Sequence, residues 1–357
     1  MPNIESARLF DLVVLTARAM GSSPAEAQDV AEHLVAANLA GHDSHGVGML
    51  PDYVRMRHEG LLVPNQTLAT LVDRGSVLVL DARRGFGQAM AKEAMRRGIA
   101  KARELGSATV ALRNSSHIGR IGHWAEQCAA AGMVSVHFVN VADHAPLQAP
   151  YGCSDSRLGT NPFAIGVPGA DGQPLYVLDM ATSAIAFGKA RVARNKGVPV
   201  PEGVLIDAQG RPTTDPTTYV DTKQGALLAF GAHKGSGLAI LCEVLGAALT
   251  GGATIAPHHP REEGILNSML SFILDPAALG DPAGIAREGR AIADWVKASP
   301  TAPGFTDILM PGEPERRARE RRLAEGVPID DKSLADIEAA IESLGVGRAE
   351  IDRALGR

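Results

Sequence analysis

The sequence has few cysteines, few aromatic residues and little net charge. Its cysteines, Cys128, Cys153 and Cys242, lie far apart, which argues against a disulfide framework and suits a reducing compartment. Aromatic residues make up 4% of the chain, which argues against a sheet surface that stacks nucleic-acid bases. The net charge of −5 gives no general attraction for nucleic acid or for an anionic membrane.

Targeting and membrane signals are also missing. The opening residues, MPNIESARLFDLVV, place no basic segment before an apolar run, so they do not resemble a secretory signal. The most apolar stretch, residues 225–249, is interrupted by His233, Lys234 and Glu243 and is too polar to span a bilayer. We therefore expect a cytoplasmic protein that binds neither nucleic acid nor membrane.

Standard nucleotide-binding and metal-binding fingerprints are absent from the sequence. No Gly-x-Gly-x-x-Gly follows a predicted strand, and residues 85–87 lack the third glycine. Residues 231–237 do not form a Walker A loop, because the lysine precedes the last two glycines. Histidine pairs occur, but no HExxH motif or paired CxxC accompanies them, so we expect no metal site.

The sequence does contain an alternation of strand-like and helix-like segments with glycine between them. Residues 88–105 have the spacing of an amphipathic helix, and residues 235–249 predict a long buried helix. Both chain ends look helical and could pack together as one unit beside a central α/β domain. The strands that we expect in that domain are residues 76–81, 108–112, 134–139, 163–167, 175–178 and 270–274.

Residues 41–46, Gly-His-Asp-Ser-His-Gly, gather polar side chains between two predicted helices. Hydride transfer at a secondary alcohol requires removal of the hydroxyl proton, and histidine suits this step because its pKa lies close to neutral pH. The other interpretation is a capping turn, in which Asp43 or Ser44 caps a helix that begins near Pro51. The residues alone leave both interpretations open.

Four further segments could contact ligands. His117 lies in residues 114–119, after a strand, where ligands gather in open α/β sheets; a surface loop is the alternative. Residues 179–183 also follow a strand and suit phosphate or ribose contacts, or else form a helix cap. Residues 159–162 could simply be a turn, whereas residues 231–237 combine glycines, a lysine and a helix start into an anion site.

Taken in order, these segments resemble one family, the type 2 malate/L-lactate dehydrogenases, which include sulfolactate, ureidoglycolate and diketogulonate oxidoreductases and an imine-reductase branch. Within it, the stretches 36–45, 117–122, 124–132 and 183–189 resemble the bacterial hydroxycarboxylate dehydrogenase B group. The motifs that carry the resemblance are Gly41-His-Asp-Ser-His-Gly46, Asn114-Ser-Ser-His117, Gly159-Thr-Asn-Pro162, Leu178-Asp-Met-Ala-Thr-Ser183, His233-Lys-Gly235 and Pro311-Gly-Glu-Pro314.

The resemblance implies an α/β fold that is not a Rossmann fold. It implies a non-Rossmann NAD(P)-binding α/β domain over residues 116–289. A second, largely helical domain would form from both chain ends, residues 1–115 and 290–357, and would serve substrate binding and dimerisation. Members of the family are typically intertwined homodimers, so a homodimer is expected.

Residue roles follow from the resemblance position by position. His45 would be the acid/base at the substrate oxygen, Ser44 would orient it, and His117 would be a second active-site histidine beside the nicotinamide. Tyr53 and Thr160 match substrate-side positions. The positions that match contacts to NAD or NADP are His117, Ile118, Gly119, Asp179, Met180, Ala181, Thr182, Ser183, His233, Lys234, Pro311, Gly312 and Glu313.

Two positions depart from the family pattern or select within it. Many members have an arginine after the Ser-His-Gly that grips the substrate carboxylate, but this chain has Met49 there. We therefore expect a bulkier or more apolar substrate, such as an aryl-lactate, with Arg120 or another cation at its carboxylate. Lys189 stands where the imine-reductase branch is expected to have an acidic residue, which favours the hydroxy-acid branch.

The resemblance therefore predicts hydride transfer between NAD(P) and a small 2-hydroxy or 2-keto acid, of malate/lactate or aryl-lactate type. Two alternatives remain. One is an NADPH-dependent reductase of cyclic imino acids, piperideine- or pyrroline-2-carboxylate. The other is a non-catalytic binding protein, against which the presence of both His45 and His117 speaks.

Overall fold

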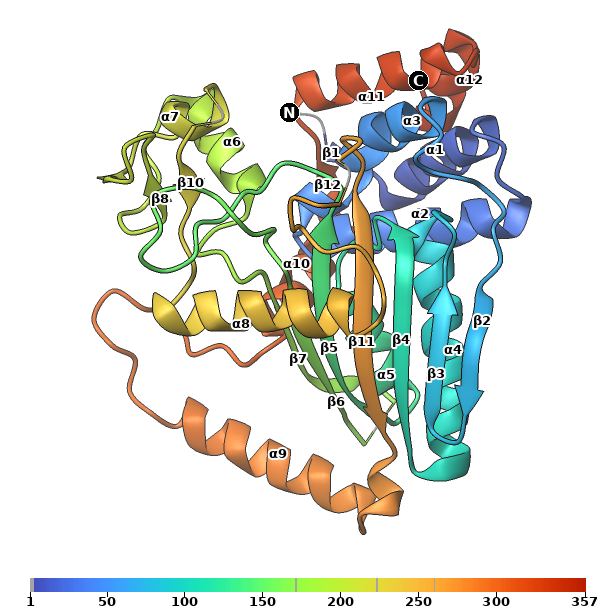
Figure 1. Ribbon diagram of the computed structural model, residues 1–357, viewed down its shortest axis with the longest axis vertical. Coiled ribbons are helices and arrows are strands. Elements are labelled where there is room, and N and C mark those ends of the chain that lie inside the picture. Colours follow the sequence, from blue (N-terminus) through green and yellow to red (C-terminus); the bar gives the residue numbers. More distant parts are fainter. Residues whose placement is uncertain (1–2, 171, 223, 260) are drawn as a thin grey trace.

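The computed structural model describes residues 3–170, 172–222, 224–259 and 261–357. Within these residues, a seven-stranded mixed sheet lies at the centre of the molecule, in the order β2-β3-β4-β11-β5-β6-β7 (Figure 1). All the strands expected from the sequence are present. The strands of this sheet are β2 (Ala69–Arg74), β3 (Val77–Asp81), β4 (Ser107–Ser116), β5 (Val134–Ala142), β6 (Phe163–Pro168), β7 (Pro174–Met180) and β11 (Leu266–Leu274).

One edge of the sheet collects the ends of several strands. β3 pairs parallel with β4, β11 is antiparallel to both β4 and β5, and β5, β6 and β7 alternate in direction. As a result β3, β4, β5 and β7 end at the same edge, where β6 and β11 begin. We call this the carboxyl edge; it is defined by Asp81, Ser116, Ala142 and Met180, the last residues of those four strands.

Helices cover both faces of the sheet. Figure 1 shows α4 (Gly87–Leu105) and α5 (Gly122–Ala130) on one face and α8 (His233–Glu243) on the other. The predicted amphipathic spacing of α4 is confirmed, because its buried residues recur every three or four positions. They include Met90, Ala91, Ala94, Met95, Ile99 and Ala102.

The long helix predicted over residues 235–249 is present, but the prediction that it is buried is wrong. Helix α8 ends at Glu243 and continues as a π-helical turn, Val244–Ala248. One side of this segment faces outward, and Leu241 and Leu249 are 51% and 65% exposed. Apolar composition predicted burial, but the sheet covers only one side of the helix.

In the described part of the chain, no helix has both the length and the apolar character needed to cross a membrane.

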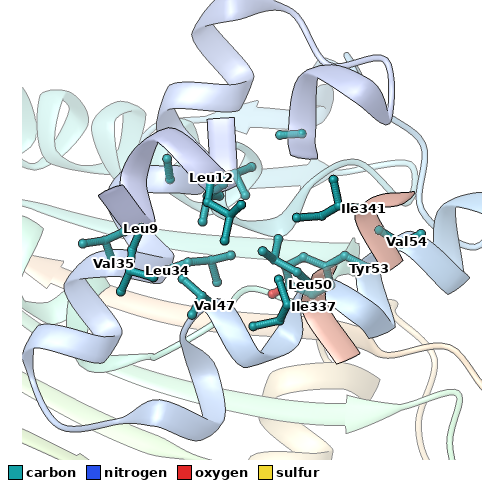
Figure 2. Packing of buried hydrophobic residues seen from close by; sticks show 14 of the residues in the cluster. Leu9, Leu12, Leu34, Val35, Val47, Leu50, Tyr53, Val54, Ile337 and Ile341 are labelled. Carbon is teal, nitrogen blue, oxygen red and sulfur yellow. The ribbon is translucent and has the colours of Figure 1, made fainter. Parts of the chain in front are cut away.

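A helical unit formed from both chain ends packs across the carboxyl edge. Its core joins α1 (Ser6–Ala19), α2 (Pro24–Leu39) and α3 (Leu50–His58) to α11 (Asp331–Ser343) and α12 (Arg348–Leu355). The short strands β1 (Asn3–Ile4) and β12 (Val327–Pro328) pair beside it. The expected α/β fold with a helical unit from both ends is confirmed. Figure 2 shows the core residues Leu9, Leu12, Leu34, Leu50, Ile337 and Ile341 in contact.

The proposed limits between the two domains stay a prediction. The central sheet begins at Ala69, which lies inside the segment 1–115 that the sequence assigned to the helical domain. Strands β2, β3 and β4 therefore belong to the same sheet as β5, β6 and β7.

Two smaller parts complete the molecule. A small unit beside the carboxyl edge contains α6 (Phe187–Lys196), α7 (Thr217–Val220) and the short strands β8 (Leu205–Ile206), β9 (Pro212–Thr213) and β10 (Ala226–Leu227). After β11, the 3₁₀ turn Pro276–Ala278 leads into α9 (Pro282–Lys297), which extends away from the far end of the sheet (Figure 1). The chain then returns to α10 (Glu313–Glu325), against α2.

Candidate active site

Two histidines from different parts of the fold meet at the carboxyl edge. His45 ends a 3₁₀ turn (Asp43–His45) between α2 and α3, and His117 directly follows β4. Their ring centroids are 5.5 Å apart. The helical unit and the sheet thus each contribute one imidazole to a shared site.

His117 has a fixed hydrogen-bonding partner. The hydroxyl of Tyr53 in α3 lies 2.8 Å from His117 Nδ1, and Gln88 Nε2 in α4 donates to the same hydroxyl oxygen at 2.7 Å. Tyr53 is fully buried, so its hydroxyl proton is best satisfied by donation to Nδ1. A neutral His117 therefore carries its proton on Nε2. Burial, together with the charges of nearby His45 and His144, lowers the pKa of His117 to about 3.

His45 also has a hydrogen-bonding partner, its neighbour Ser44. The Nδ1 of His45 lies 2.9 Å from Ser44 Oγ, and an orienting role for Ser44 stays a prediction. Burial lowers the pKa of His45 to about 4, and the positive charges of His42 and Arg120 act in the same direction. At neutral pH both active-site imidazoles are therefore uncharged.

The turn that carries His45 is clamped by residues that the sequence analysis did not identify. Asn38 Oδ1 accepts from Val47 N at 2.8 Å, and Asn38 Nδ2 donates to Asp43 Oδ1 at 2.7 Å. A Cβ at Gly46 would lie 2.2 Å from the Asn38 side chain, so only glycine fits there. Arg322 of α10 also binds Asp43, at 2.6 and 2.9 Å.

The alternative reading of residues 41–46 as a capping turn is wrong. Helix α3 begins at Leu50, and no side chain caps its first turn. Asp43 bonds to Asn38 and Arg322 instead, and Ser44 bonds to His45. The polar side chains of this turn are therefore used around His45 and not at the helix start.

Arg120 lies behind the two histidines. It is 2% exposed, and its guanidinium contacts Glu126 at 2.5 Å and Asp179 at 3.5 Å. Among the described residues its Nε has no hydrogen-bond partner. Burial raises the pKa of the Asp179 carboxyl, against the opposing effect of Arg120. A role for Arg120 at the substrate carboxylate stays a prediction.

His33 of α2 fixes the loop after His117. Its Nε2 accepts from the backbone N–H of Arg120 at 2.9 Å. Gly119 has φ of +71°, and a Cβ there would lie 2.0 Å from His33 Nε2. The glycine therefore allows the loop both its left-handed conformation and its contact with the imidazole. The sequence does not predict the contact between His33 and this loop, because helical spacing identifies His33 only as a buried position of α2.

Several of the expected cofactor segments are brought together. Thr182 donates both its N–H and its hydroxyl to the carbonyl of Thr160, each at 2.9 Å, and Phe230 N donates to Thr182 O at 3.0 Å. Hydrogen bonds therefore link Thr160 to the segment 179–183, and link that segment to Phe230, which lies just before residues 231–234. His233 and Lys234 lie exposed at the start of α8.

A cavity of about 480 Å³ lies beside these segments and against the small unit, whose Gly203, Ile206, Gly210 and Pro212 also line it; neither His45 nor His117 is among its described lining residues. It is bounded on one side by Ala184, next to the segment 179–183, and on another by Phe230, Gly231 and Ala232, directly before His233. Tyr151 also lines it and places its ring edge against that of His233, with centroids 5.9 Å apart.

The segment Pro311–Glu313 lies against β7, next to Val177. Val177 N of β7 donates to Pro311 O at 3.3 Å, and the Glu313 carboxylate binds Lys297 at 2.5 Å and Met310 N at 2.8 Å. Within the described ranges, no group of three or more His, Cys, Asp or Glu side chains is placed to hold a metal ion.

Comparison with known proteins covers almost the whole chain. A profile described as malate/L-lactate dehydrogenase matches residues 4–338. The chain is 49% identical over 351 residues to hydroxycarboxylate dehydrogenase B of Escherichia coli (strain K12), covering 96% of each. A solved structure of a putative malate/lactate dehydrogenase from E. coli superposes with a TM-score of 0.95 at 47% identity, covering 100% of this chain and 99% of that one.

A more distant relative represents the imine-reductase branch. The chain is 36% identical over 326 residues to the Delta(1)-pyrroline-2-carboxylate/Delta(1)-piperideine-2-carboxylate reductase of Pseudomonas putida, covering 89% of this chain and 91% of the relative.

Proposed function

The chain belongs to the malate/L-lactate dehydrogenase family and is an oxidoreductase, and on that premise we propose that it moves a hydride between NAD or NADP and a small 2-hydroxy acid. The observation that carries the proposal is the pair His45 and His117, whose ring centroids lie 5.5 Å apart and whose Nδ1 atoms are both bound, so that each ring leaves Nε2 without a hydrogen bond among the described residues. A dehydrogenase needs a group that takes the hydroxyl proton and a group that holds the same oxygen, and this pair can supply both.

The residues around the cavity fit a dinucleotide. His233 and Lys234 are exposed at the N-terminus of α8, where free backbone N–H groups and a cationic side chain suit a pyrophosphate. The adjoining cavity of about 480 Å³ has room for part of such a ligand. When bound, the nicotinamide would supply or accept the hydride. The segments 179–183 and His117 to Gly119 would contact it from the sheet side.

His45 is proposed as the acid/base. If His45 Nδ1–H donates to Ser44 Oγ, its Nε2 lone pair is free to accept the hydroxyl proton of the substrate. In the reverse direction the same nitrogen returns the proton to the oxygen of the 2-keto acid. The low pKa of His45 keeps this nitrogen unprotonated at neutral pH, and a bound carboxylate would raise that pKa.

His117 is proposed to hold the reacting oxygen. Because Tyr53 donates to Nδ1, His117 Nε2–H is the donor that remains for the substrate. Tyr53 was expected to touch the substrate, but its hydroxyl is buried against His117, so we propose that it acts through that ring. Thr160, Arg120 and Met49 remain our candidates for the substrate side. Met49, part buried against the helical core, favours an apolar group such as an aryl-lactate side chain.

The test is a substrate panel. Purified protein is assayed with 2-keto acids of malate, lactate and aryl-lactate type and with a cyclic imine, each with NADH and with NADPH, at the nicotinamide absorbance band. We expect turnover of keto acids and little of the imine. Preferential imine reduction would replace the proposal by the imine-reductase function, and binding without any turnover would indicate a binding protein.

We also propose a homodimer in the cytoplasm. The described residues leave the apolar side of α9 uncovered, with Trp295 81% and Ile292 56% exposed, and an exposed surface of this kind is typical of a subunit contact. The three cysteines are unpaired, as a reducing compartment requires. Light scattering should give twice the chain mass, and W295E should lower it. A monomer in the parent protein would reject the dimer.

A further inference from the structure

We propose that Glu243 is a positioning residue that acts through buried asparagine side chains. It holds two segments in place, residues 159–162 (the Thr160 turn) and residues 117–120 (the His117 loop). The proposal rests on the proposed function of those two segments. Glu243 lies on α8, on the face opposite to α4 and α5 (Figure 1). It is 8% exposed and touches neither active-site histidine in any hydrogen bond of the described residues.

The Glu243 carboxylate is held by N–H donors alone. Oε1 accepts from Ile255 N at 2.6 Å and from Asn140 Nδ2 at 3.3 Å, and Oε2 accepts from Asn161 Nδ2 at 2.8 Å. In the part of the chain that the structure describes, no lysine or arginine forms an ion pair with it. Burial raises the pKa of Glu243, and these donors oppose that effect. A buried carboxylate with no lysine or arginine partner is costly unless its oxygens are hydrogen-bonded, so the position of Glu243 is tied closely to these three N–H donors.

One arm of the network leads to the substrate side. Asn161 is fully buried, and its amide bridges three segments. Its Oδ1 accepts from Val141 N of β5 at 3.1 Å, and its Nδ2 also donates to Ala239 O of α8 at 3.0 Å. The residue before it is Thr160, whose carbonyl receives both donors of Thr182. Glu243 thereby fixes the turn on which two expected ligand contacts depend.

The other arm leads to His117. Asn140 Oδ1 accepts from Ser268 N at 3.0 Å, and Asn140 O accepts from Asn267 Nδ2 at 2.9 Å. Asn267 Oδ1 then accepts from Ile118 N at 2.9 Å, directly after His117. Asn140 and Asn267 are 0% and 2% exposed. Buried hydrogen bonds therefore run from α8 to the loop that presents the second imidazole.

The end of α8 is packed too closely to shift freely. After Glu243 the helix widens into the π-helical turn Val244–Ala248. A Cβ at Gly246 would lie 2.9 Å from the carbonyl oxygen of Phe138 in β5. Since the first turn of the same helix carries His233 and Lys234, the network ties the expected phosphate site, the Thr160 turn and His117 into one rigid set.

The test replaces one oxygen by an amide nitrogen. In E243Q the new side-chain NH₂ group faces Asn161 Nδ2, which is also a donor. The hydrogen bond from Asn161 to the Glu243 carboxylate is therefore replaced by a contact between two N–H donors. A displacement of about 1 Å can cost roughly 10²-fold in rate, so we expect kcat to fall by about 10–100-fold. In N161D/E243Q the new amide can donate to the new carboxylate, and part of kcat should return.

The matched control is E338Q. Glu338 in α11 is also buried, and its carboxylate accepts hydrogen bonds from Arg348 at 2.7 Å and from Arg357 at 2.8 Å. It lies in the helical unit and not at the carboxyl edge. E338Q should lower Tm and leave kcat and both KM values unchanged. Equal kcat in E243Q and the parent protein, or a fall in E338Q that matches that in E243Q, would overturn the proposal.

A second readout does not need activity. The Thr182 and Ile118 amides should exchange hydrogen faster in E243Q, because their acceptors are released, and E338Q should leave them unchanged. If E243Q does not fold, N267A, which removes the acceptor of Ile118 N together with the donor to Asn140 O, should raise exchange at Ile118 and lower kcat. If the parent protein is inactive but E243Q shows this faster exchange, only the dehydrogenase proposal is rejected. If the parent protein is active but E243Q exchanges at the parental rate, only the positioning role of Glu243 is rejected.

Discussion

Two buried histidines, one inside the sheet and one at its carboxyl edge, have a similarly lowered pKa but differ in their hydrogen bonds. His137, in the middle of β5, has both ring nitrogens bound, Nδ1 to Ser271 Oγ at 2.8 Å and Nε2 to Ser135 Oγ at 2.9 Å. Among the described residues, His117 at the carboxyl edge forms a hydrogen bond through Nδ1 alone, to Tyr53. Burial lowers the pKa of each to about 3.

The difference shows what separates a structural imidazole from a chemical one. Burial and a perturbed pKa are common to both residues and so do not identify the site. The distinguishing feature is a ring nitrogen without a protein partner that faces a second imidazole, as His117 faces His45. The following predictions test that distinction, from the largest expected effect to the smallest.

The largest effect is expected at His45. H45A removes the proposed proton acceptor, so kcat should fall by roughly 10²–10⁴-fold while the fold persists. Steady-state kinetics with the best substrate from the panel measures it, with circular dichroism as the check on folding. Near-parental kcat would remove His45 from the mechanism and shift the role to His117.

An intermediate effect is expected at Tyr53. Y53F removes the hydroxyl that sets the tautomer of His117 and leaves Gln88 Nε2 without its acceptor. We expect kcat to fall by roughly 10–100-fold, because the ring nitrogen that faces the substrate is no longer defined. The pH profile of kcat should shift as well, since His117 loses a partner. A change in stability without a change in kcat would contradict the assigned tautomer.

The smallest kinetic effect is expected at His137. H137Q leaves at least one serine hydroxyl in the sheet with a poorer partner, which should cost about 1–3 kcal/mol of unfolding free energy. Since His137 has no free nitrogen, kcat should not change. Urea denaturation and kinetics on the same sample decide the point, and a tenfold loss of kcat would break the comparison with His117.

Stability should depend on pH through the same residues. The unfolded chain takes up protons on histidine as pH falls through about 6.5, whereas His45, His117 and His137 stay neutral in the fold until about 4, 3 and 3. The unfolded state then binds more protons, so the free energy of unfolding falls as pH drops from 6.5 toward 4. H137Q should make that slope shallower by up to about 1.4 kcal/mol per pH unit; an unchanged slope would contradict the lowered pKa of His137.

Local pattern predicted much of this molecule. The strands, α4, and the two histidine segments follow from alternation, helical spacing and polar residues after strands. The family motifs were identified from sequence, and the match over residues 4–338 confirms the family. Such signals are contained within a few neighbouring residues, which is why they are visible in a single sequence.

The partners of those residues were not predictable. Gln88, Asn38 and His33 look like ordinary helix positions, and their importance comes from atoms that are distant in the sequence. The insertion of β11 between β4 and β5 also has no local sign. Helix α8 was expected to be buried because composition reports apolar content, while burial depends on which side a neighbour covers.

The placement of β11 has a consequence for synthesis on the ribosome. Residues 266–274 connect β4 to β5, so neither half of the sheet can join the other until that late strand has emerged. The helical core waits still longer, because α11 and α12 are translated after β11. Nascent chains should therefore expose unpaired strand edges for most of translation, which makes this a protein whose yield depends on chaperones and on temperature during expression.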